Sequence, residues 1–224
     1  MKMLVFVLGL SALTLIHASG ALSLLEEAKL SNWSHIQWHG QTDYQQVMDL
    51  EQGVVIRAHS QGSASGFELN QSVDLTQTPT LHWLWTVERF PFVNKVGEDG
   101  LEKTLERFDE SKAGNNDFAV RLTVGTSAFF GPAKQLHYVW SAHHDAGHMW
   151  PLGPNEAVFV VNGQESNTLI WQTNRQNLSA DWKKAFGEEV TTIDFIRIMT
   201  DTDDTQGQAI GYFGDIHLLP DSAR

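Results

Sequence analysis

The sequence predicts an all-β fold, a two-sheet antiparallel jelly-roll sandwich with one or two short helices in the connections. From Thr42 onward apolar and polar residues alternate, which is typical of half-buried strands. The alternating segments are short, evenly spaced and rich in aromatic and β-branched residues, and turn residues such as Gln61-Gly62-Ser63 separate them. Many short strands joined by turns favour a sandwich over a helical or α/β fold.

Nine segments are expected to be strands. In the third of them, Leu81, Trp83, Trp85 and Val87 fall on one face, so we expect that face to pack into the core. The nine segments are Val54–His59, Gly66–Asn70, Thr80–Glu88, Asp117–Val124, Leu136–Ala142, Ala157–Val161, Thr168–Thr173, Thr191–Thr200 and Gln208–Leu219.

Two segments carry a helical pattern. Ser179 is expected to cap a helix over Ala180–Phe186, and Gly187 is expected to end it. In the charged segment Glu98–Glu110, apolar residues recur at helical spacing. We therefore expect a second short helix inside a surface insertion at about residues 91–116.

The N-terminal residues follow the order of a secretory signal peptide. A positive charge precedes the apolar run Leu4–Ile16, and small residues follow it. We expect residues 1–20 to be removed by cleavage after about Gly20 or Ala21, which leaves a single β-sandwich domain over residues 21–224. The apolar run is shorter than the ~20 residues that a membrane span needs, so no membrane insertion is expected after cleavage.

The composition of the chain limits the cellular compartments and the classes of partner that fit this protein. The chain has no cysteine, which excludes disulfides and cysteine-bound zinc. Because eukaryotic secreted domains more often depend on disulfides, we expect a bacterial periplasmic or secreted protein. The formal net charge of −12 disfavours nucleic acid and anionic membranes, which attract basic surfaces. A glycan or another small neutral ligand, a cation and a protein partner all remain compatible.

Motifs in a set order run through almost the whole chain. They are Ser63-Ala64-Ser65-Gly66, Leu81-His82-Trp83-Leu84-Trp85, Asn116-Asp117-Phe118-Ala119-Val120-Arg121, Leu136-His137-Tyr138-Val139-Trp140, Trp171 with Asn174-Arg175-Gln176-Asn177, Asp181-Trp182, Met199-Thr200-Asp201-Thr202-Asp203-Asp204-Thr205 and Tyr212-Phe213-Gly214-Asp215-Ile216. As a set they resemble the bacterial family known as domain of unknown function 3047. Asp204 and Trp182 depart from the family pattern, in which Asn and Tyr are expected. The resemblance implies an exported bacterial protein and supplies neither an activity nor catalytic residues.

A looser resemblance concerns the end of the chain. The segments Ile193–Met199 and Ile210–Leu218 resemble the closing strands of jelly-roll carbohydrate-binding modules and galactose-binding-like sandwiches. Those modules often end on an aromatic-Asp-Ile strand like Tyr212-Phe213-Gly214-Asp215-Ile216. This similarity concerns architecture, and function depends on the residues of a site.

The turn after the strand Thr191–Thr200 concentrates negative charge. Asp201, Asp203 and Asp204 lie together with no Lys or Arg inside the turn, so solvent, backbone N–H groups, an Arg from elsewhere or a cation must compensate them. Carboxylate and hydroxyl oxygens suit Ca²⁺, but the spacing is not that of an EF-hand. We expect no cofactor, and Ca²⁺ bound by these three residues is the alternative.

Charged and aromatic residues elsewhere suggest a ligand site. Structural ion pairs are expected between Asp117 and Arg121, which lie four residues apart, and between Arg197 and Asp215. The functional alternative is a sheet face on which Arg and Asp bind sugar hydroxyls and aromatic rings stack on sugar rings. For that alternative the predicted ligand-binding residues are Asp117, Arg121, Trp140 and Arg175.

The loop His143-His144-Asp145-Ala146-Gly147-His148 combines imidazoles with a carboxylate, which are transition-metal ligands. Gly147 and Pro151 disfavour a helix that would align His144 with His148, so a mobile polar loop is favoured over a metal site.

The chain shows no G-x-S-x-G, H-E-x-x-H or phosphate-binding glycine motif, so no catalytic residue is predicted. The favoured function is a non-catalytic exported binding module, and the expected ligand is a glycan. One alternative is a hydrolase of cell-envelope polysaccharide that uses Asp117 with Asp203, because glycosidases need a carboxylate pair. Another is an envelope protein–protein interaction domain.

Overall fold

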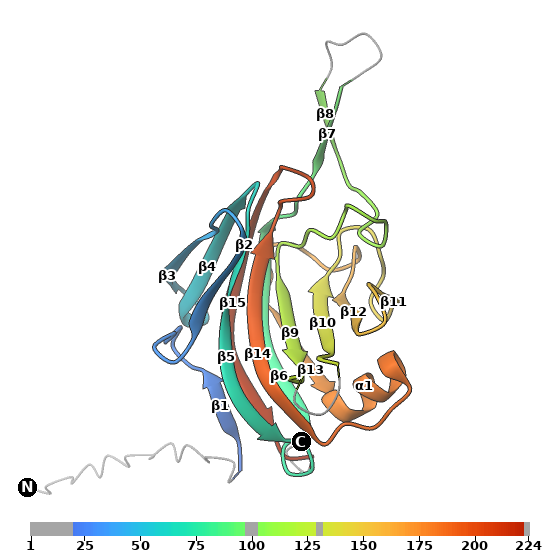
Figure 1. The fold of residues 1–224 in the computed structure, drawn as a ribbon. Helices are drawn as coiled ribbons and strands as arrows, with labels where there is room; N and C mark the ends of the chain where they lie inside the picture. Colours follow the sequence, from blue (N-terminus) through green and yellow to red (C-terminus); the bar gives the residue numbers. More distant parts are fainter. Residues whose placement is uncertain (1–19, 97–102, 129–131, 222–224) are drawn as a thin grey trace, which may run out of the picture.

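The computed structural model describes residues 20–96, 103–128 and 132–221. In these residues two sheets pack face to face around a common core, and one helix lies beside them (Figure 1). The predicted all-β fold of two packed sheets is confirmed. Apart from Gly20, the predicted signal peptide lies outside the described residues. Among the described residues, no helix has the length and apolar character to cross a membrane.

One sheet has six strands. Five follow the order β13-β6-β15-β4-β3, and β1 pairs with the C-terminal part of β15. They are β1 (Leu22–Leu25), β3 (Asp43–Asp49), β4 (Gly53–Gln61), β6 (Thr80–Arg89), β13 (Gln172–Asn177) and β15 (Gln208–Leu219).

The other sheet has seven strands in the order β11-β12-β10-β9-β14-β5-β2. They are β2 (Ser34–His39), β5 (Ala64–Asp74), β9 (Arg121–Gly125), β10 (Gln135–Trp140), β11 (Met149–Pro151), β12 (Glu156–Asn162) and β14 (Thr192–Asp201).

All nine predicted segments overlap strands. Gln208–Leu219 matches β15 at both ends, but Thr168–Thr173 shares only its last two residues with β13. Six strands were not predicted: β1, β2, β3, β7 (Val93–Val96), β8 (Lys103–Glu106) and β11. Of these, β2 and β3 are mostly exposed and β11 is very short, so the alternation of apolar and polar residues that marks a strand is weak there.

In the described residues the two large sheets are antiparallel, as predicted, except at one pair of strands. Strands β10 and β12 pair in parallel, whereas β11 pairs antiparallel with β12. The chain leaves β10, crosses the end of β12 through residues 141–148, forms the edge strand β11 and returns as β12. Because β11 runs antiparallel to both β10 and β12, the chain returns along β12 in the same direction as β10, and sequence periodicity does not report that choice.

The predicted helix in Glu98–Glu110 is wrong over the part that the structure describes, residues 103–110. Val93–Val96 and Lys103–Glu106 form the antiparallel hairpin β7–β8, which projects from the sandwich within the predicted insertion (Figure 1). Residues 97–102 of the predicted helix lie outside the described residues. Phe108 follows the hairpin and is buried, so its apolar character serves tertiary packing rather than a helical face.

The second predicted helix is confirmed as α1 (Leu178–Phe186). Its N-cap is Asn177 rather than the predicted Ser179, because the Asn177 side chain accepts a hydrogen bond from the Ala180 N–H at 3.0 Å. Gly187 ends the helix as predicted, with a φ of 72° in the left-handed region.

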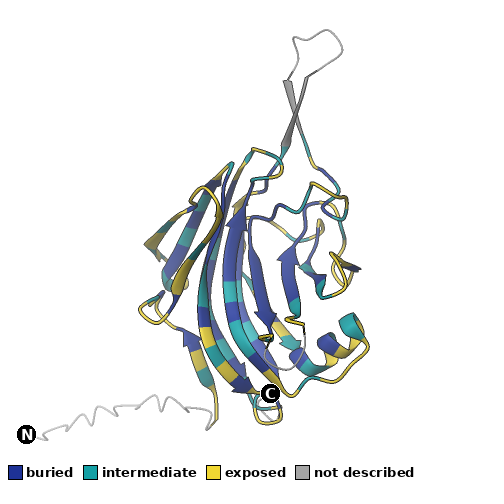
Figure 2. Ribbon diagram, in the orientation of Figure 1, coloured by how far each residue is buried: buried dark blue, intermediate teal, exposed yellow. Residues whose placement is uncertain are grey.

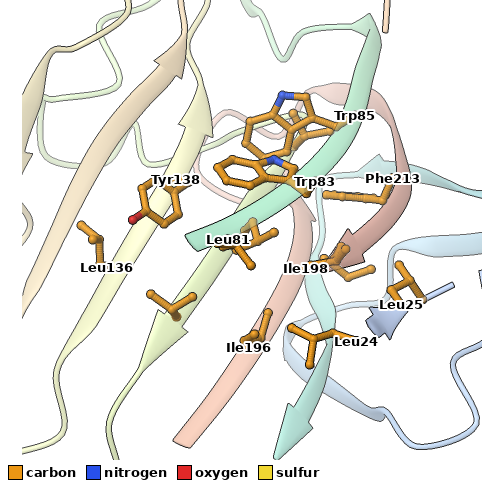
Figure 3. Packing of buried hydrophobic residues seen from close by; sticks show 14 of the residues in the cluster. Leu24, Leu25, Leu81, Trp83, Trp85, Leu136, Tyr138, Ile196, Ile198 and Phe213 are labelled. Carbon is orange, nitrogen blue, oxygen red and sulfur yellow. The ribbon is translucent and has the colours of Figure 1, made fainter. Parts of the chain in front are cut away.

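The core lies between the inner faces of the two sheets. Trp83 and Trp85 are fully buried, as predicted, and their rings meet edge to face at 5.3 Å (Figure 3). The Trp85 indole N–H donates a 2.6 Å hydrogen bond to Asn162 Oδ1. The polar atom of this buried side chain therefore has a partner. Buried residues concentrate in the central strands, and exposed residues in β3 and the connections (Figure 2).

The two sheets approach closely at Gly211 of β15. A Cβ added there would lie 2.3 Å from the Ala119 carbonyl oxygen and 2.4 Å from a Val120 methyl group. Because the first contact is with backbone, Gly211→Ala should lower the free energy of unfolding by about 1–3 kcal/mol in urea denaturation. Gly153→Ala is the matched control, since a Cβ there meets nothing within 4 Å. Equal effects of the two substitutions would contradict this account of the packing.

Candidate functional site

A polar groove of 290 Å³ lies on the seven-stranded sheet. The register of the strands explains its composition. Arg197 of β14 is opposite Glu68 of β5 on one side and Thr123 of β9 on the other. Thr123 is in turn opposite His137 of β10. Directly opposite residues share a face, and their neighbour Leu122 packs in the core, so this row faces outward.

Arg197 organises one part of the groove. Its Nε and Nη2 donate to Glu68 Oε2 at 3.0 and 2.5 Å, and its Nη1 donates to Gln135 Oε1 at 3.0 Å. The amide of Gln135 in turn donates to Glu156 at 3.2 Å. The predicted pair of Arg197 with Asp215 is therefore wrong, because Glu68 is the partner. This network holds the guanidinium plane in place on the sheet.

Trp38 is the aromatic residue at the groove. It lies at a β-bulge, where the pairing of β2 with β5 shifts between Gln37 and His39. The Arg197 guanidinium lies 4.9 Å from the Trp38 ring centroid, a cation–π contact. Half of the Trp38 surface is exposed (50%), so its ring is accessible to a ligand.

His137 is a buried imidazole in the groove lining. Burial lowers the pKa of His137 to about 4, so the ring is neutral at pH 7. Its Nδ1 forms a 2.8 Å hydrogen bond with Thr123 Oγ1, whereas Nε2 has no hydrogen-bond partner and lies 3.7 Å from Glu156. A buried polar atom without a partner carries a free-energy cost that a bound hydroxyl would remove.

Arg121 and Asp201 form a buried ion pair at the other end of the groove. Their side chains are 7% and 3% exposed, and Arg121 Nη2 lies 2.8 Å from Asp201 Oδ2. Arg121 also donates to the Asn116 carbonyl at 2.5 Å. Burial raises the pKa of Asp201 to about 7, with Arg121 acting against this shift and Asp117 adding to it. The predicted ion pair of Arg121 with Asp117 is therefore wrong, because Asp201 is the partner of Arg121.

Asp117 fixes the acidic turn. Its carboxylate accepts hydrogen bonds from the N–H groups of Asp204 and Thr205 and from the Thr205 hydroxyl. In return, Asp204 accepts a bond from the Asn116 N–H at 2.7 Å. Backbone N–H groups and Arg121 therefore compensate the carboxylates of Asp117, Asp201 and Asp204.

The predicted metal ligands come together only in part. One carboxylate oxygen from each of Asp117, Asp201 and Asp203 lies within 4.8 Å of the others, and Asp117 thus stands where Asp204 was predicted. Asp117 and Asp201 already accept hydrogen bonds from protein donors. Calcium binding at this turn remains the alternative that the sequence raised.

The structure separates the four predicted ligand-binding residues. Arg121 lines the groove. Asp117 is buried beneath the turn and is 1% exposed. Trp140 is a core residue, 1% exposed, with its indole bonded to the Gly163 carbonyl, so it cannot stack on a ligand in this structure. Arg175 of β13 is opposite His82 on the six-stranded sheet, away from the groove.

Sequence reasoning missed Trp38, Glu68, Gln135, His137 and Glu156. The short, polar segment around Trp38 gave little sign of a strand, and Trp38 lies on an edge strand whose residues are mostly exposed. The other four belong to three strands that were recognised, but only the register of the sheet brings them together.

A second groove of 330 Å³ lies on the six-stranded sheet. Trp171 and Tyr212 line it together with Met48 and Leu169. This groove provides an internal comparison for experiments on the polar groove, because each contains a Trp side chain.

The low pKa of His137 predicts a pH dependence of stability. Between about pH 6.5 and 4 the unfolded chain binds a proton at this residue and the folded chain does not, so the free energy of unfolding falls as the pH falls. His137→Gln should remove a contribution of roughly 3 kcal/mol across this range. The raised pKa of Asp201 has the opposite effect between about pH 4 and 7, where its contribution to the free energy of unfolding grows as the pH falls. The quantity to measure by urea denaturation is therefore the free energy of unfolding of the wild type minus that of the variant at each pH. A difference that does not change with pH would contradict the low pKa of His137.

The hydrogen bonds to the acidic turn predict its response to ions. Because N–H donors and Arg121 already compensate the carboxylates of Asp117, Asp201 and Asp204, Ca²⁺ and Mg²⁺ at equal concentration should shift the melting temperature equally, through screening alone. Differential scanning fluorimetry with and without a chelator measures this. A shift of several degrees specific to Ca²⁺, lost in Asp203→Ala, would instead identify a calcium site.

Solved structures with a similar chain path include carbohydrate-active proteins. The family 11 carbohydrate-binding module of the cellulosomal cellulase Lic26A-Cel5E of Clostridium thermocellum is 11% identical, with 90% of this chain and 95% of that chain covered and a TM-score of 0.47. TmCBM61 in complex with β-1,4-galactotriose is 11% identical, with 86% and 91% covered and a TM-score of 0.37. The glycoside hydrolase domain of Endo-D from Streptococcus pneumoniae R6 is 7% identical, with 86% and 22% covered and a TM-score of 0.43. Because all three TM-scores are below 0.5, the ligands in these names say nothing about the ligand of this chain.

Comparison with curated proteins gives no match. A family model described as "Protein of unknown function (DUF3047)" matches residues 31–217, which is most of the chain. The resemblance inferred from the motifs is confirmed, and the chain belongs to the DUF3047 family.

Proposed function

We propose that this protein is an exported, non-catalytic module that binds a neutral glycan in the polar groove of the seven-stranded sheet. The exposed ring of Trp38 at the groove is the observation that carries the proposal. A flat aromatic ring beside fixed polar groups suits a sugar, which has an apolar ring face and hydroxyl groups around its edge.

The polar residues support this assignment. Arg197, Gln135 and Glu156 form a connected network, and the unpartnered Nε2 of His137 lies beside it. Donors and acceptors held in this way match hydroxyl groups, which both donate and accept. Side chains fixed by their neighbours lose little conformational entropy when a ligand binds.

The charges of the groove favour a neutral ligand. The groove is lined by two arginines and four carboxylates, so it does not attract an anion. The carboxylates are Glu156, Asp201, Asp203 and Asp204, and the arginines are Arg121 and Arg197.

The hydrolase alternative is less well supported. It needs two accessible carboxylates on opposite sides of a bond, at about 5–9.5 Å. Asp117, one of the predicted pair, is 1% exposed and bonded to the turn. The third alternative, an envelope interaction domain, requires no small ligand.

The test is a screen of neutral soluble polysaccharides by affinity electrophoresis, with reducing-sugar release measured in parallel. Trp38→Ala should weaken binding of the retained polysaccharide at least tenfold, since loss of aromatic stacking costs about 1.4 kcal/mol or more. The fold should persist because Trp38 is half exposed.

Trp171→Ala, in the second groove, is the matched control and should bind as the wild type does. Loss of binding in Trp171→Ala alone would move the site to the six-stranded sheet. Sugar release by the wild-type protein would favour the hydrolase, and the absence of both binding and release would favour the interaction domain.

A further inference from the structure

We propose that Asp109, His143 and His144 form a binding site for a divalent transition metal of the zinc type. The site lies at the end of β10 and shares no residue with the polar groove. It therefore stands independently of the proposed glycan binding.

The three side chains converge although they come from two distant segments. One carboxylate oxygen and two imidazole nitrogens lie within 4.8 Å of one another, and His144 Nε2 is 2.8 Å from Asp109 Oδ1. Ligand atoms around a tetrahedral Zn²⁺ with ~2.0 Å bonds are ~3.3 Å apart. Small side-chain rotations would thus convert the present cluster into a coordination shell.

The buried carboxylate of Glu110 joins the segment that carries Asp109 to the segment that carries His143 and His144. Glu110, directly after Asp109, is 3% exposed and accepts bonds from the Ser141 hydroxyl at 2.9 Å and the Ala142 N–H at 2.8 Å. The same Ser141 oxygen accepts the N–H groups of His143 and His144 at 3.1 and 2.8 Å. The backbones of all three proposed ligands are therefore tied to one hydrogen-bonded centre.

The histidine loop is also fixed on its other side. The His144 carbonyl accepts the Gln164 N–H at 3.2 Å, and the Gly147 N–H donates to Val160 of β12 at 2.8 Å. A Cβ on Gly163 would lie 2.6 Å from the His144 oxygen, so this close approach requires glycine. The expected mobile polar loop is in this structure a crossing segment bonded to β12, with Asp109 rather than Asp145 as the carboxylate beside His144.

The chemical types of the three ligands indicate which kind of metal the site would bind. Two imidazoles and one carboxylate suit Zn²⁺ and neighbouring transition metals, whereas Ca²⁺ and Mg²⁺ prefer oxygen ligands alone. Asp109 Oδ1 accepts hydrogen bonds from the Ser111 N–H at 3.0 Å and the Ser111 hydroxyl at 2.5 Å, which hold the carboxylate in place beside His144. Lys112, 3.6 Å from Asp109 and 71% exposed, is a weak competitor.

Three protein ligands leave at least one coordination position open to water or another ligand. The exposed side of His143 provides the entry path. His148 stacks on His144 at 4.4 Å and Trp150 lies 5.0 Å from His144, so a quenching metal bound here would lie close to an indole.

The test is isothermal titration calorimetry of the purified protein, freed of any affinity tag and chelator, with ZnCl₂ and separately with CaCl₂. One Zn²⁺ should bind per chain at micromolar or lower concentration, and Ca²⁺ should not bind there. His143→Ala, His144→Ala and Asp109→Asn should each weaken Zn²⁺ binding at least tenfold, and the double substitution His143→Ala/His144→Ala should abolish it.

Asp145→Asn is the matched control because Asp145 lies in the same loop and its side chain accepts a hydrogen bond from Gln164, outside the cluster. It should bind Zn²⁺ as the wild type does. Circular dichroism confirms folding of each variant, and Co²⁺ should give visible absorption bands in the wild type that the His143→Ala/His144→Ala protein lacks. Absence of saturable Zn²⁺ binding, its persistence in the double variant, or equal weakening by Asp145→Asn would overturn the proposal.

Discussion

The buried ion pair between Arg121 and Asp201 is the interaction on which the organisation of the seven-stranded sheet depends. It joins the first residue of β9 to the last residue of β14. A charge left alone in that position would cost several kcal/mol, so the two strand ends must meet. Their meeting brings Asp117 beneath the acidic turn, where its three hydrogen bonds close the turn. The wall of the polar groove is thus a consequence of pairing one buried arginine.

The same strands serve the core and the groove. Along β9, Leu122 and Val124 pack inward while Arg121 and Thr123 face outward, because successive side chains of a strand alternate. Residues that bind a ligand from such strands inherit the rigidity of the sandwich. In a chain without disulfides, the apolar packing of the sandwich together with the hydrogen bonds and ion pairs of the groove holds these side chains in place.

The parallel pairing of β10 with β12 has a comparable consequence at the edge of the sheet. Reaching β11 requires a segment that crosses the end of β12, and this segment carries His143 and His144. Glu110 bonds to its start and thereby brings Asp109 beside the imidazoles. The proposed metal site is therefore built where the topology departs from a simple antiparallel sandwich.

The sequence by itself determined the fold class, the inward face of Trp83 and Trp85, and the helix that Gly187 ends, because these features follow from local periodicity and local backbone preference. Its motifs also identified the family. Partners distant in sequence were decided only by the tertiary structure. Arg121 pairs with Asp201 and not with Asp117, which is nearer in sequence. The Trp140 side chain is buried in the core, whereas Trp38 is exposed. Strand register, the position of β2 at the edge of its sheet and the crossing connection set these outcomes, and each depends on contacts that a one-dimensional pattern does not contain.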